Sequence, residues 1–399
     1  MKILVLDEEF PFPSDTGKRI RSYNLFRRLA KKHEIHYLAY GEMDSIPFIT
    51  FKESGLNPVA VPNMVPEKSG PLFYLRLAAN LFSKLPYIVT SHYSKPFRDE
   101  MIRLIEQVAP DMILCEWTPY AEYVRDIKNI PKVVVAHNVE SRIWRRYHET
   151  EKNPAKKWYI ARQVTKLEKY EKDVFGMCNG VTAVSQSDAC EIAGLCPHAR
   201  VSVVENGVDL DYFNHRSLTV DKDSMVFVGT MDWRPNQDAV TYFVREIFPL
   251  ILEKRPSAHA VFVGRKPPEF IRAYNDIEGI QIIGSVEDIR PYVHAAAVYI
   301  VPLRIGGGTR LKILDAMAMH KPIVSTVVGA EGLEVTDGEN ILLADSAESF
   351  AERVISLLQD RELQAKLAQN GRALVEAKYG WDSLADKLDR FLQEVVQNR

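Results

Sequence analysis

The stretch Val301-Pro-Leu-Arg-Ile-Gly-Gly-Gly-Thr-Arg-Leu-Lys-Ile-Leu-Asp-Ala-Met-Ala-Met-His-Lys-Pro-Ile-Val-Ser325 decides the fold. Apolar and β-branched residues at 298–303 predict a short buried strand, which the three glycines that follow it do not continue. Apolar residues at helical spacing then predict a helix that begins at Thr309. A second buried strand is predicted from Ile323 to Val328. The stretch therefore predicts one strand, turn, helix and strand unit of an α/β fold.

The start of this predicted helix favours an anionic ligand. A helix that begins behind glycines exposes unpaired N–H groups and the positive end of its dipole, and both suit phosphate oxygens. Arg310 and Lys312 add two cations to the first turn, where a helix without a ligand favours Asp or Glu. A carboxylate, Asp315, follows in the next turn. We interpret this segment as a phosphate-binding element, and a solvent-facing turn with incidental charge is the alternative.

Strands alternate with helices along the whole chain, which predicts parallel sheets covered on both faces. The strands predicted before residue 205 are 2–6, 35–40, 59–61, 112–115, 133–136, 180–184 and 201–204. The pattern restarts after a polar stretch, with strands predicted at 225–228, 260–263, 280–283, 298–303, 323–328 and 341–344. We therefore expect two Rossmann-like domains, 1–205 and 206–380, and a return helix, 381–399, that packs on the first. Ligands of such sheets bind beyond the carboxyl ends of the strands, so we expect a cleft between the domains.

The first βαβ unit argues against a nicotinamide cofactor. Its loop, residues 11–17, lacks the GxGxxG pattern, and no acidic residue follows the second strand at the spacing of a dinucleotide site. The helix after this loop is predicted from Lys18 to Lys32, with Leu25 and Leu29 inside and Arg21 outside.

Composition excludes several other classes of protein. The net charge of −2 over 399 residues gives no indication of nucleic-acid binding. The four cysteines form no pair or Cys/His cluster with zinc spacing, and we interpret them as reduced cytosolic thiols. Glu205, Asp209 and Asp211 form no convincing metal site, and we expect neither a metal nor a cofactor. The most apolar window, residues 72–89, contains two basic residues and a proline, which argues against a membrane span. The first residues predict a strand and not a signal peptide, so we expect a cytoplasmic location.

Three motifs together resemble one family. They are the glycine-rich turn with its helix, the turn Asn206-Gly-Val-Asp209, and Val228-Gly-Thr-Met-Asp-Trp-Arg-Pro-Asn236. They resemble the family 4, group 1 glycosyltransferases, and the loop Phe10-Pro-Phe-Pro-Ser-Asp-Thr-Gly-Lys-Arg19 resembles sugar transferases of bacterial exopolysaccharide gene clusters. The resemblance implies the GT-B fold, with two Rossmann-like domains facing across a cleft. It also implies a nucleotide-diphosphate-sugar donor, a glycan or lipid-linked acceptor, and a retaining reaction that needs no metal.

The resemblance assigns roles to particular residues. His137 lies at the end of a predicted strand and would contact the transferred sugar, whereas a core histidine is the alternative. Gly17 and Gly229 would lie against the donor diphosphate, and Asp315 would accept hydrogen bonds from ribose hydroxyls. The diphosphate would be held by Gly306, Gly307, Gly308, Thr309, Arg310 and Lys312. Of these residues, His137, Arg310 and Lys312 would act in catalysis.

This sequence departs from the family pattern at two places. The family commonly has two carboxylates separated by seven residues, whereas this chain has Gly307 at the first position and Asp315, in place of Glu, at the second. The first loop of the second domain usually carries an Arg and a Lys, and here Arg234 stands at a different position. Neutralisation of the diphosphate would therefore depend on Arg310 and Lys312.

Two other functions fit these motifs. One is a nucleotide-sugar epimerase of the same fold, which needs no acceptor. The other is a non-catalytic nucleotide-sugar-binding protein, for which Gly307 is the strongest argument.

Residues 142–172 place many basic side chains among aromatic ones, which predicts peripheral contact with an anionic membrane. For a cytoplasmic protein this contact would be with the inner face of the membrane. Because Glu149, Glu151, Glu168 and Glu171 are interleaved with these cations, a solvated helical face is the alternative.

Overall fold

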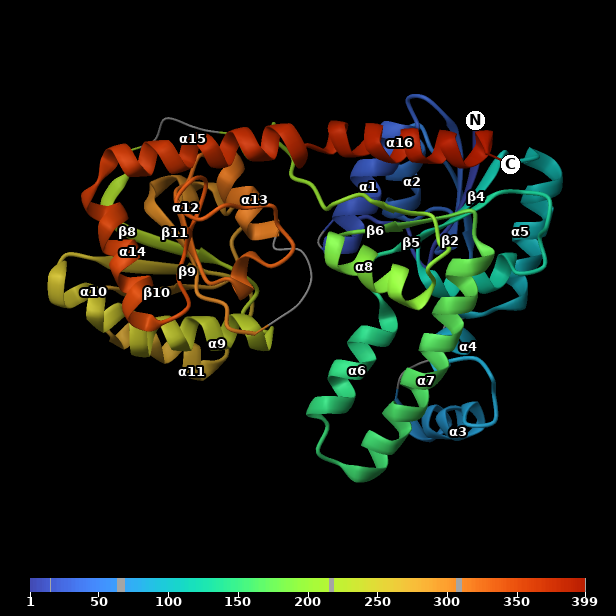
Figure 1. Ribbon diagram of the computed structural model, residues 1–399, viewed down its shortest axis with the longest axis horizontal. Coiled ribbons are helices and arrows are strands. Elements are labelled where there is room, and N and C mark those ends of the chain that lie inside the picture. The colour runs from blue at the N-terminus through green and yellow to red at the C-terminus, as the bar shows by residue number, and fades with distance from the viewer. Residues whose placement is uncertain (15, 63–68, 215–218, 306–310, 399) are drawn as a thin grey trace. The chain divides into compact units, whose positions relative to one another are not determined.

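The computed structural model describes residues 1–14, 16–62, 69–214, 219–305 and 311–398 of the chain. The chain divides into two compact units (Figure 1). The N-terminal unit comprises Met1–Glu205 and Leu384–Arg399, and the C-terminal unit comprises Asn206–Ser383. Each unit has a parallel sheet of its own and a hydrophobic core built around that sheet. The α/β class predicted from the sequence is confirmed.

The N-terminal sheet has the strand order β3-β2-β1-β4-β5-β6-β7, and all neighbouring strands are parallel. Its central strands are apolar without alternation; Ile3 to Leu6 are all fully buried, as expected where helices cover both faces. The strands are β1 (Lys2–Leu6), β2 (Glu34–Tyr40), β3 (Asn57–Val61), β4 (Met112–Cys115), β5 (Lys132–Ala136), β6 (Gly180–Ala183) and β7 (Val201–Val203).

The helices of this unit begin at capping side chains in several places. Thr16, Ser94 and Ser185 each accept a hydrogen bond from a backbone N–H in the first turn of the helix that follows. The helices are α1 (Gly17–Leu29), α2 (Ile46–Glu53), α3 (Gly70–Asn80), α4 (Tyr87–His92), α5 (Lys95–Val108), η1 (Thr118–Val124), α6 (Glu140–Thr150), α7 (Pro154–Met177) and α8 (Gln186–Leu195).

The last helix, α16 (Trp381–Gln397), packs on the N-terminal unit. Lys32 Nζ lies 2.7 Å from Asp386 Oδ1, and His33 Nε2 lies 2.7 Å from Asp389 Oδ1. Gly180 leaves room for the Phe391 ring, because a Cβ at that glycine would lie 2.8 Å from the ring. The end of the chain is therefore held by both ion pairs and apolar contacts.

The C-terminal sheet has the strand order β10-β9-β8-β11-β12-β13, again with parallel neighbours. Its strands are β8 (Asp221–Val228), β9 (His259–Val263), β10 (Ile280–Ile283), β11 (Ala296–Val301), β12 (Ile323–Ser325) and β13 (Leu342–Leu343). Its helices are α9 (Arg234–Tyr242), η2 (Phe243–Ile247), α10 (Phe248–Lys254), α11 (Glu269–Arg272), η3 (Ala273–Asp276), α12 (Arg290–Ala295), α13 (Leu311–Ala318), η4 (Val328–Ala330), α14 (Ala347–Gln359) and α15 (Arg361–Lys378).

Two local predictions are wrong. The strand predicted from Ile323 to Val328 ends at Ser325, because the Thr326 hydroxyl donates to Leu303 O and accepts from the Gly329 N–H, which turns the chain into η4. Arg21, predicted on the outer face of its helix, is buried with only 1% of its surface exposed. No helix in the described ranges is both long enough and apolar enough to span a membrane.

Candidate functional site

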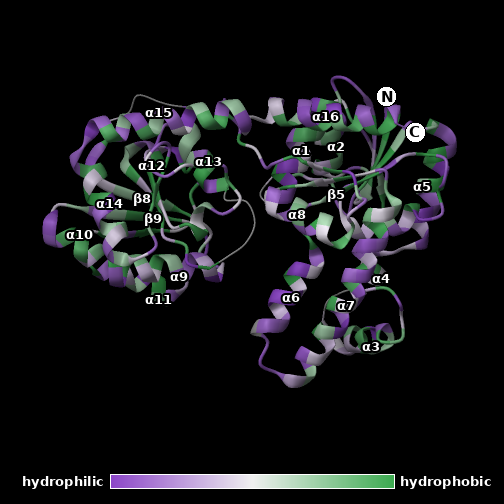
Figure 2. Cartoon of the chain, viewed as in Figure 1, coloured by the Kyte–Doolittle hydropathy of each residue, from purple (hydrophilic) through white to green (hydrophobic). Residues whose placement is uncertain are grey.

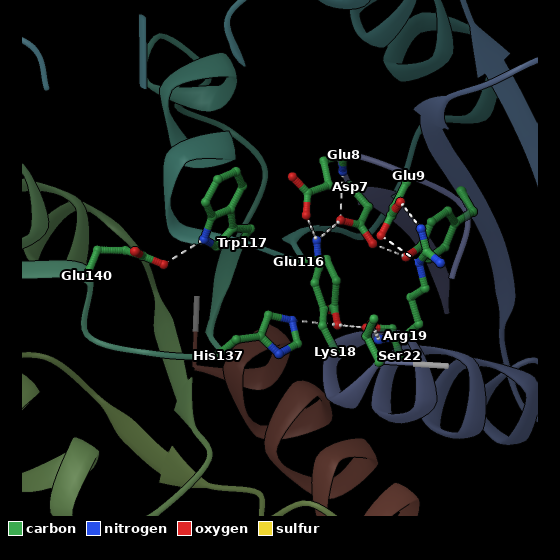
Figure 3. A network of polar contacts seen from close by, with 12 residues as sticks. Asp7, Glu8, Glu9, Lys18, Arg19, Ser22, Glu116, Trp117, His137 and Glu140 are labelled. Atoms are coloured by element: carbon green, nitrogen blue, oxygen red, sulfur yellow. Dashed lines mark hydrogen bonds and ion pairs between the residues drawn. The ribbon is translucent and has the colours of Figure 1, made fainter. Parts of the chain in front are cut away.

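Three polar residues of the N-terminal unit each come directly after a central strand. Asp7 follows β1, Glu116 follows β4 and His137 follows β5. Because these three strands are adjacent and parallel, the three side chains meet at the carboxyl edge of the sheet, beside the first turns of α1 (Figure 3). This edge is where parallel α/β sheets place their ligands.

Asp7, which is fully buried, forms an ion pair with the partly exposed Lys18 of α1. Lys18 Nζ lies 2.7 Å from Asp7 Oδ1 and 2.8 Å from Glu8 Oε1, and the Tyr37 hydroxyl donates to Asp7 Oδ2 at 2.5 Å. Burial raises the pKa of Asp7 to about 7, against the opposing effect of the Lys18 charge. Burial lowers the pKa of Lys18, but the charges of Asp7 and Glu8 raise it by more. The start of α1 therefore carries a fixed cation.

Glu116 links the start of α1 to His137. Its Oε1 accepts a hydrogen bond from the Ser22 hydroxyl at 2.6 Å and lies 3.2 Å from His137 Nε2. Burial raises the pKa of Glu116, but His137, Ser22 and the charge of Arg21 lower it by more, so Glu116 is a carboxylate at neutral pH. The buried Arg21 also donates to Glu205 O at 2.5 Å.

His137 is neutral at neutral pH, because burial lowers its pKa below the ordinary 6.5 despite the opposing effect of Glu116. His137 Nε2 lies 3.2 Å from Glu116 Oε1 without hydrogen-bond geometry, so we assign the ring hydrogen to Nε2 from the electrostatic attraction of the carboxylate. Nδ1 is then an acceptor for a hydroxyl group. The structure places His137 at the end of β5, as predicted, and within a polar cluster that was not predicted; its contact with a sugar remains a prediction.

A second set of contacts fixes the segment that follows His137. The N–H groups of Glu140 and Ser141, at the start of α6, donate to the two carboxylate oxygens of Glu171 at 2.6 and 3.2 Å. Trp117 Nε1 donates to Glu140 Oε1 at 2.9 Å, and the Trp117 ring lies 5.6 Å from Lys18 Nζ. Burial raises the pKa of Glu171 to about 7. Glu171 therefore holds a helix start from inside the protein and does not belong to a solvated face.

Gly17, which the sequence assigned to the donor diphosphate, is the first residue of α1 and is exposed. Thr16, immediately before it, accepts a hydrogen bond from the Arg19 N–H at 3.4 Å.

In the C-terminal unit, Gly229 and Gly264 follow the adjacent strands β8 and β9. The Gly229 N–H donates to Val263 O at 2.9 Å. A Cβ on Gly264 would lie 1.8 Å from Gly229 O, and a Cβ on Gly229 would lie 2.8 Å from Lys312 Nζ and from Asn236 Nδ2. Position 264 therefore requires glycine because a backbone carbonyl approaches it, whereas a side chain at 229 would displace the ends of the Lys312 and Asn236 side chains.

Lys312, in the first turn of α13, reaches this glycine loop. Its Nζ donates to Asn236 Oδ1 at 2.9 Å and lies 4.2 Å from the centre of the Phe227 ring. Asn236 Nδ2 in turn donates to Thr230 O at 2.7 Å. The structure thus brings together Lys312 and Gly229, two of the residues that the sequence assigned to the diphosphate. Five others, Gly306, Gly307, Gly308, Thr309 and Arg310, lie outside the described residues.

Asp315 lies one turn further along α13. Burial raises the pKa of its carboxyl group to about 7. Burial also raises the pKa of Tyr299 on β11, and the charge of Asp315 adds to this shift. Asp315 is half-buried, and a hydroxyl-bearing ligand could relieve the desolvation of its carboxyl group by hydrogen bonding.

Sequence reasoning missed several residues of these two clusters. In the N-terminal unit they are Asp7, Lys18, Arg21 and Glu116. In the C-terminal unit Arg265, next to Gly264, donates from Nε to Thr230 Oγ1 at 3.2 Å. Arg234, which the sequence offered as the cation of this loop, is an exposed residue at the start of α9. Their positions in the sequence could have identified these residues. Asp7 and Glu116 directly follow a strand, and Arg265 follows Gly264 at a strand end.

These two α/β units define the GT-B fold, which comparison with solved structures supports. Sucrose-phosphate synthase from Thermosynechococcus elongatus has a TM-score of 0.69 at 17% sequence identity, with 100% of both chains covered. HepE from Anabaena, solved in complex with UDP, has a TM-score of 0.70 at 14% identity, with 99% of this chain and 100% of that chain covered.

Sequence comparison shows the family. Residues 17–212 match the profile of Glycosyltransferase Family 4, and residues 222–360 match that of Glycosyl transferases group 1. An uncharacterized 44.6 kDa protein in the cps region of Klebsiella pneumoniae is 22% identical over 399 residues, which cover 95% of this chain and 96% of that protein. The chain belongs to the group 1, family 4 glycosyltransferases, and the activity predicted from the sequence is confirmed at that level.

Proposed function

We propose that this glycosyltransferase moves a sugar from a nucleotide-diphosphate sugar to a glycan or lipid-linked acceptor, with retention at the anomeric carbon and without a metal ion. The proposed setting is cell-surface polysaccharide synthesis on the inner face of an anionic membrane. The cps-region relative supports the setting. HepE, solved with UDP-glucose as well as with UDP, supports the class of donor.

The observation that carries the proposal is the approach of Lys312 to Gly229. The ammonium group of Lys312 lies where a side chain at position 229 would otherwise be. A cation and a stretch of backbone without a side chain are therefore adjacent. The diphosphate gains negative charge as its bond to the sugar breaks. A cation fixed in advance stabilises that charge more in the transition state than in the ground state. In the proposed reaction Lys312 has this role, together with Arg310.

The same cations support metal independence. Within the described ranges, no three His, Cys, Asp or Glu side chains form a group that could hold a metal ion. The charge on the leaving group is then neutralised by Lys312, Arg310 and backbone N–H groups.

His137 has a role that follows from its neutral state. With Nε2 directed at Glu116, Nδ1 accepts a hydrogen bond from a hydroxyl of the transferred sugar and so orients the ring. Glu116 is then a positioning residue, because its negative charge favours the tautomer of His137 with the hydrogen on Nε2. Because the lowered pKa keeps His137 as neutral imidazole, it has no readily given proton, and His137 is not assigned as the general acid.

Retention follows if the acceptor attacks from the face that the diphosphate leaves. The bond between the acceptor oxygen and the anomeric carbon forms on that face while the bond between this carbon and the phosphate oxygen breaks. The proton of the acceptor hydroxyl passes to an oxygen of the departing phosphate. The products are the glycoside and the nucleoside diphosphate.

The experiment that tests the donor assignment is a thermal-shift panel of UDP-, GDP-, ADP- and dTDP-glucose and the corresponding mannose donors, each with EDTA present. We expect at least one donor to raise the midpoint for the wild type, and Lys312→Ala to reduce that rise. Lys254→Ala, an exposed lysine on the same unit, is the matched control. If no donor shifts the midpoint, or if Lys312→Ala responds like the wild type, the donor assignment is wrong.

Turnover then separates the remaining alternatives. Release of nucleoside diphosphate is measured with octyl glucoside or octyl galactoside as acceptor probes. A donor that is bound but neither hydrolysed nor transferred would indicate a non-catalytic binding protein. Conversion of the donor sugar without release of the nucleotide would indicate an epimerase.

A further inference from the structure

Helix α3 of the N-terminal unit exposes large apolar side chains. Leu72, Tyr74 and Leu75 are 65, 68 and 65% exposed, and Phe82, just after the helix, is 93% exposed. Phe73 and Leu77, on the opposite side of the helix, are partly buried against the unit. Figure 2 shows most of α3 in the green of hydrophobic residues. A surface helix normally turns a polar face to water, so this one is built for an apolar or interfacial environment.

The structure fixes this helix on α7. Asn80, the last residue of α3, is buried; its amide accepts from Gln163 Nε2 at 2.9 Å, and its carbonyl accepts from Lys166 Nζ at 2.5 Å. The Phe73 ring lies edge-on to the Tyr87 ring, with 5.9 Å between their centres. Figure 1 shows α3 beside the first half of α7. The exposed apolar side chains therefore stand on a fixed element.

All charged residues of the two segments that meet here are cations. Residues 69–92, which contain α3, and residues 154–167, the first part of α7, contain no Asp or Glu. Trp158, on the same part of α7, is 53% exposed. The charged residues of the two segments are Arg76, Lys84, Lys156, Lys157, Arg162 and Lys166.

The neighbouring helix α6 has more acid partners than this surface, where Glu151 approaches Lys156 and Lys157. Arg145 pairs with Glu168 at 2.7 Å, and Arg142 lies 3.4 Å from both Asp188 and Glu191. The cations of α6 are thus partly neutralised by acids of the N-terminal unit. The basic surface is therefore narrower than the sequence predicted, and it is joined by an apolar helix outside the predicted segment.

We propose that α3 and the first part of α7 form a docking surface for an anionic lipid bilayer. Leu72, Leu75 and Phe82 enter the boundary between head groups and acyl chains, and the cations of α7 pair with lipid phosphates. Trp158 suits the head-group level, where its ring and its N–H meet different surroundings. The charge favours lipid over a second copy of this chain, because each copy would present the same cations.

This inference deepens the membrane contact of the proposed function, and its test needs no turnover. The full chain is mixed with vesicles of phosphatidylcholine containing about 30% phosphatidylglycerol, or of phosphatidylcholine alone, and bound protein is measured by co-sedimentation. We expect binding to the anionic vesicles to be at least tenfold tighter, and to weaken steeply as salt is raised.

Two double variants test the two parts of the surface. Leu75→Ser with Phe82→Ser should weaken binding to anionic vesicles at least tenfold, whereas Met43→Ser with Ile46→Ser should leave it unchanged. Met43 and Ile46 are 69 and 72% exposed on the same unit but lie outside the surface. Lys156→Glu with Lys157→Glu should also weaken binding at least tenfold.

The matched charge control is Lys31→Glu with Lys52→Glu, two exposed lysines elsewhere on the unit, which should bind as the wild type does. Circular dichroism and the donor-induced thermal shift establish that each variant is folded. A variant that loses vesicle binding and keeps its donor response supports the surface independently of the proposed reaction.

Three results would overturn the inference. They are equal binding to neutral and anionic vesicles, binding that both test variants retain, and a dimer in solution that Leu75→Ser with Phe82→Ser dissociates. The last result would assign the helix to contact between copies of the chain. If no donor shifts the unfolding midpoint of the wild type while vesicle binding is intact, the proposed reaction is refuted and the docking surface is not.

Discussion

Replacing Asp315 by asparagine should stabilise the ligand-free protein at alkaline pH while it weakens donor binding. Burial is the cause that raises the pKa of this carboxyl group from 3.8 to about 7. A shift of about 3 units corresponds to at most about 4 kcal/mol at about 1.4 kcal/mol per unit. That free energy is an upper bound on the cost of keeping this half-buried carboxyl group ionised above the raised pKa, because solvent screens part of it.

The direction of the pH dependence follows from linkage. A group whose pKa is raised on folding contributes stability that is fully present below its unfolded pKa of 3.8 and is lost as the pH rises through about 7. The asparagine variant has no proton to lose at this position. Its stability relative to the wild type should therefore increase between pH 4 and pH 8, by up to about 4 kcal/mol, and then level off.

The assay is urea unfolding of the full chain at a series of pH values, with wild type and Asp315→Asn compared at each. Asp276→Asn, an exposed position on the same unit, is the control and should follow the wild type. Calorimetry with the donor found by thermal shift should show weaker binding to Asp315→Asn, because a charged acceptor has become a neutral amide. Parallel pH profiles of wild type and Asp315→Asn would refute the burial argument. Unchanged donor affinity would remove Asp315 from the ribose site.

Three further predictions follow from the two clusters. Lys312→Ala should lose about 2–4 kcal/mol of transition-state stabilisation, seen as kcat/KM, by analogy with one preorganised donor; unchanged kcat/KM would exclude its contact with the diphosphate. If protonation of His137 sets the acid limb of the pH–kcat profile, we expect that limb below pH 6.5. Glu116→Gln should move the limb to still lower pH, because the carboxylate stabilises the imidazolium. A limb that does not move would show that Glu116 does not act on His137. Gly264→Ala should lower the free energy of unfolding in urea by more than about 3 kcal/mol, because the new Cβ would meet Gly229 O. The control Gly284→Ala, which has open space around it, should be tolerated. Equal stability of Gly264→Ala and the wild type would contradict the close approach.

The sequence predicted the sheets well because parallel strands that are buried on both faces are continuous apolar runs. It failed at Ile323–Val328, where hydrogen bonds from the Thr326 side chain end the strand. Such bonds compete with the sheet ladder without changing the apolar pattern. Strand existence was therefore predictable there, and the strand end was not.

The candidate site was predicted in part. The resemblance to the family selected His137 and Gly229, and both follow the rule that ligands of parallel sheets bind beyond strand ends. The same rule applied to Asp7 and Glu116 would have found the rest of the N-terminal cluster, but a carboxylate after a strand also fits an ordinary solvated turn. Arg21 could not be found by helical periodicity, because its partners, Glu116 and Glu205, are distant in sequence and meet it only in the folded unit.

The central claim is that the sugar is transferred with retention, and the anomer formed first tests it most directly. Hydrolysis or transfer to octyl glucoside is followed by proton NMR from the first minutes, with EDTA present and with an α-linked nucleotide-sugar donor. Observing the product before mutarotation makes the anomer that the enzyme forms visible. The account predicts that the α-anomer appears first and that EDTA does not lower the rate. Appearance of the β-anomer first, or a reaction abolished by EDTA and restored by Mg²⁺ or Mn²⁺, would contradict it.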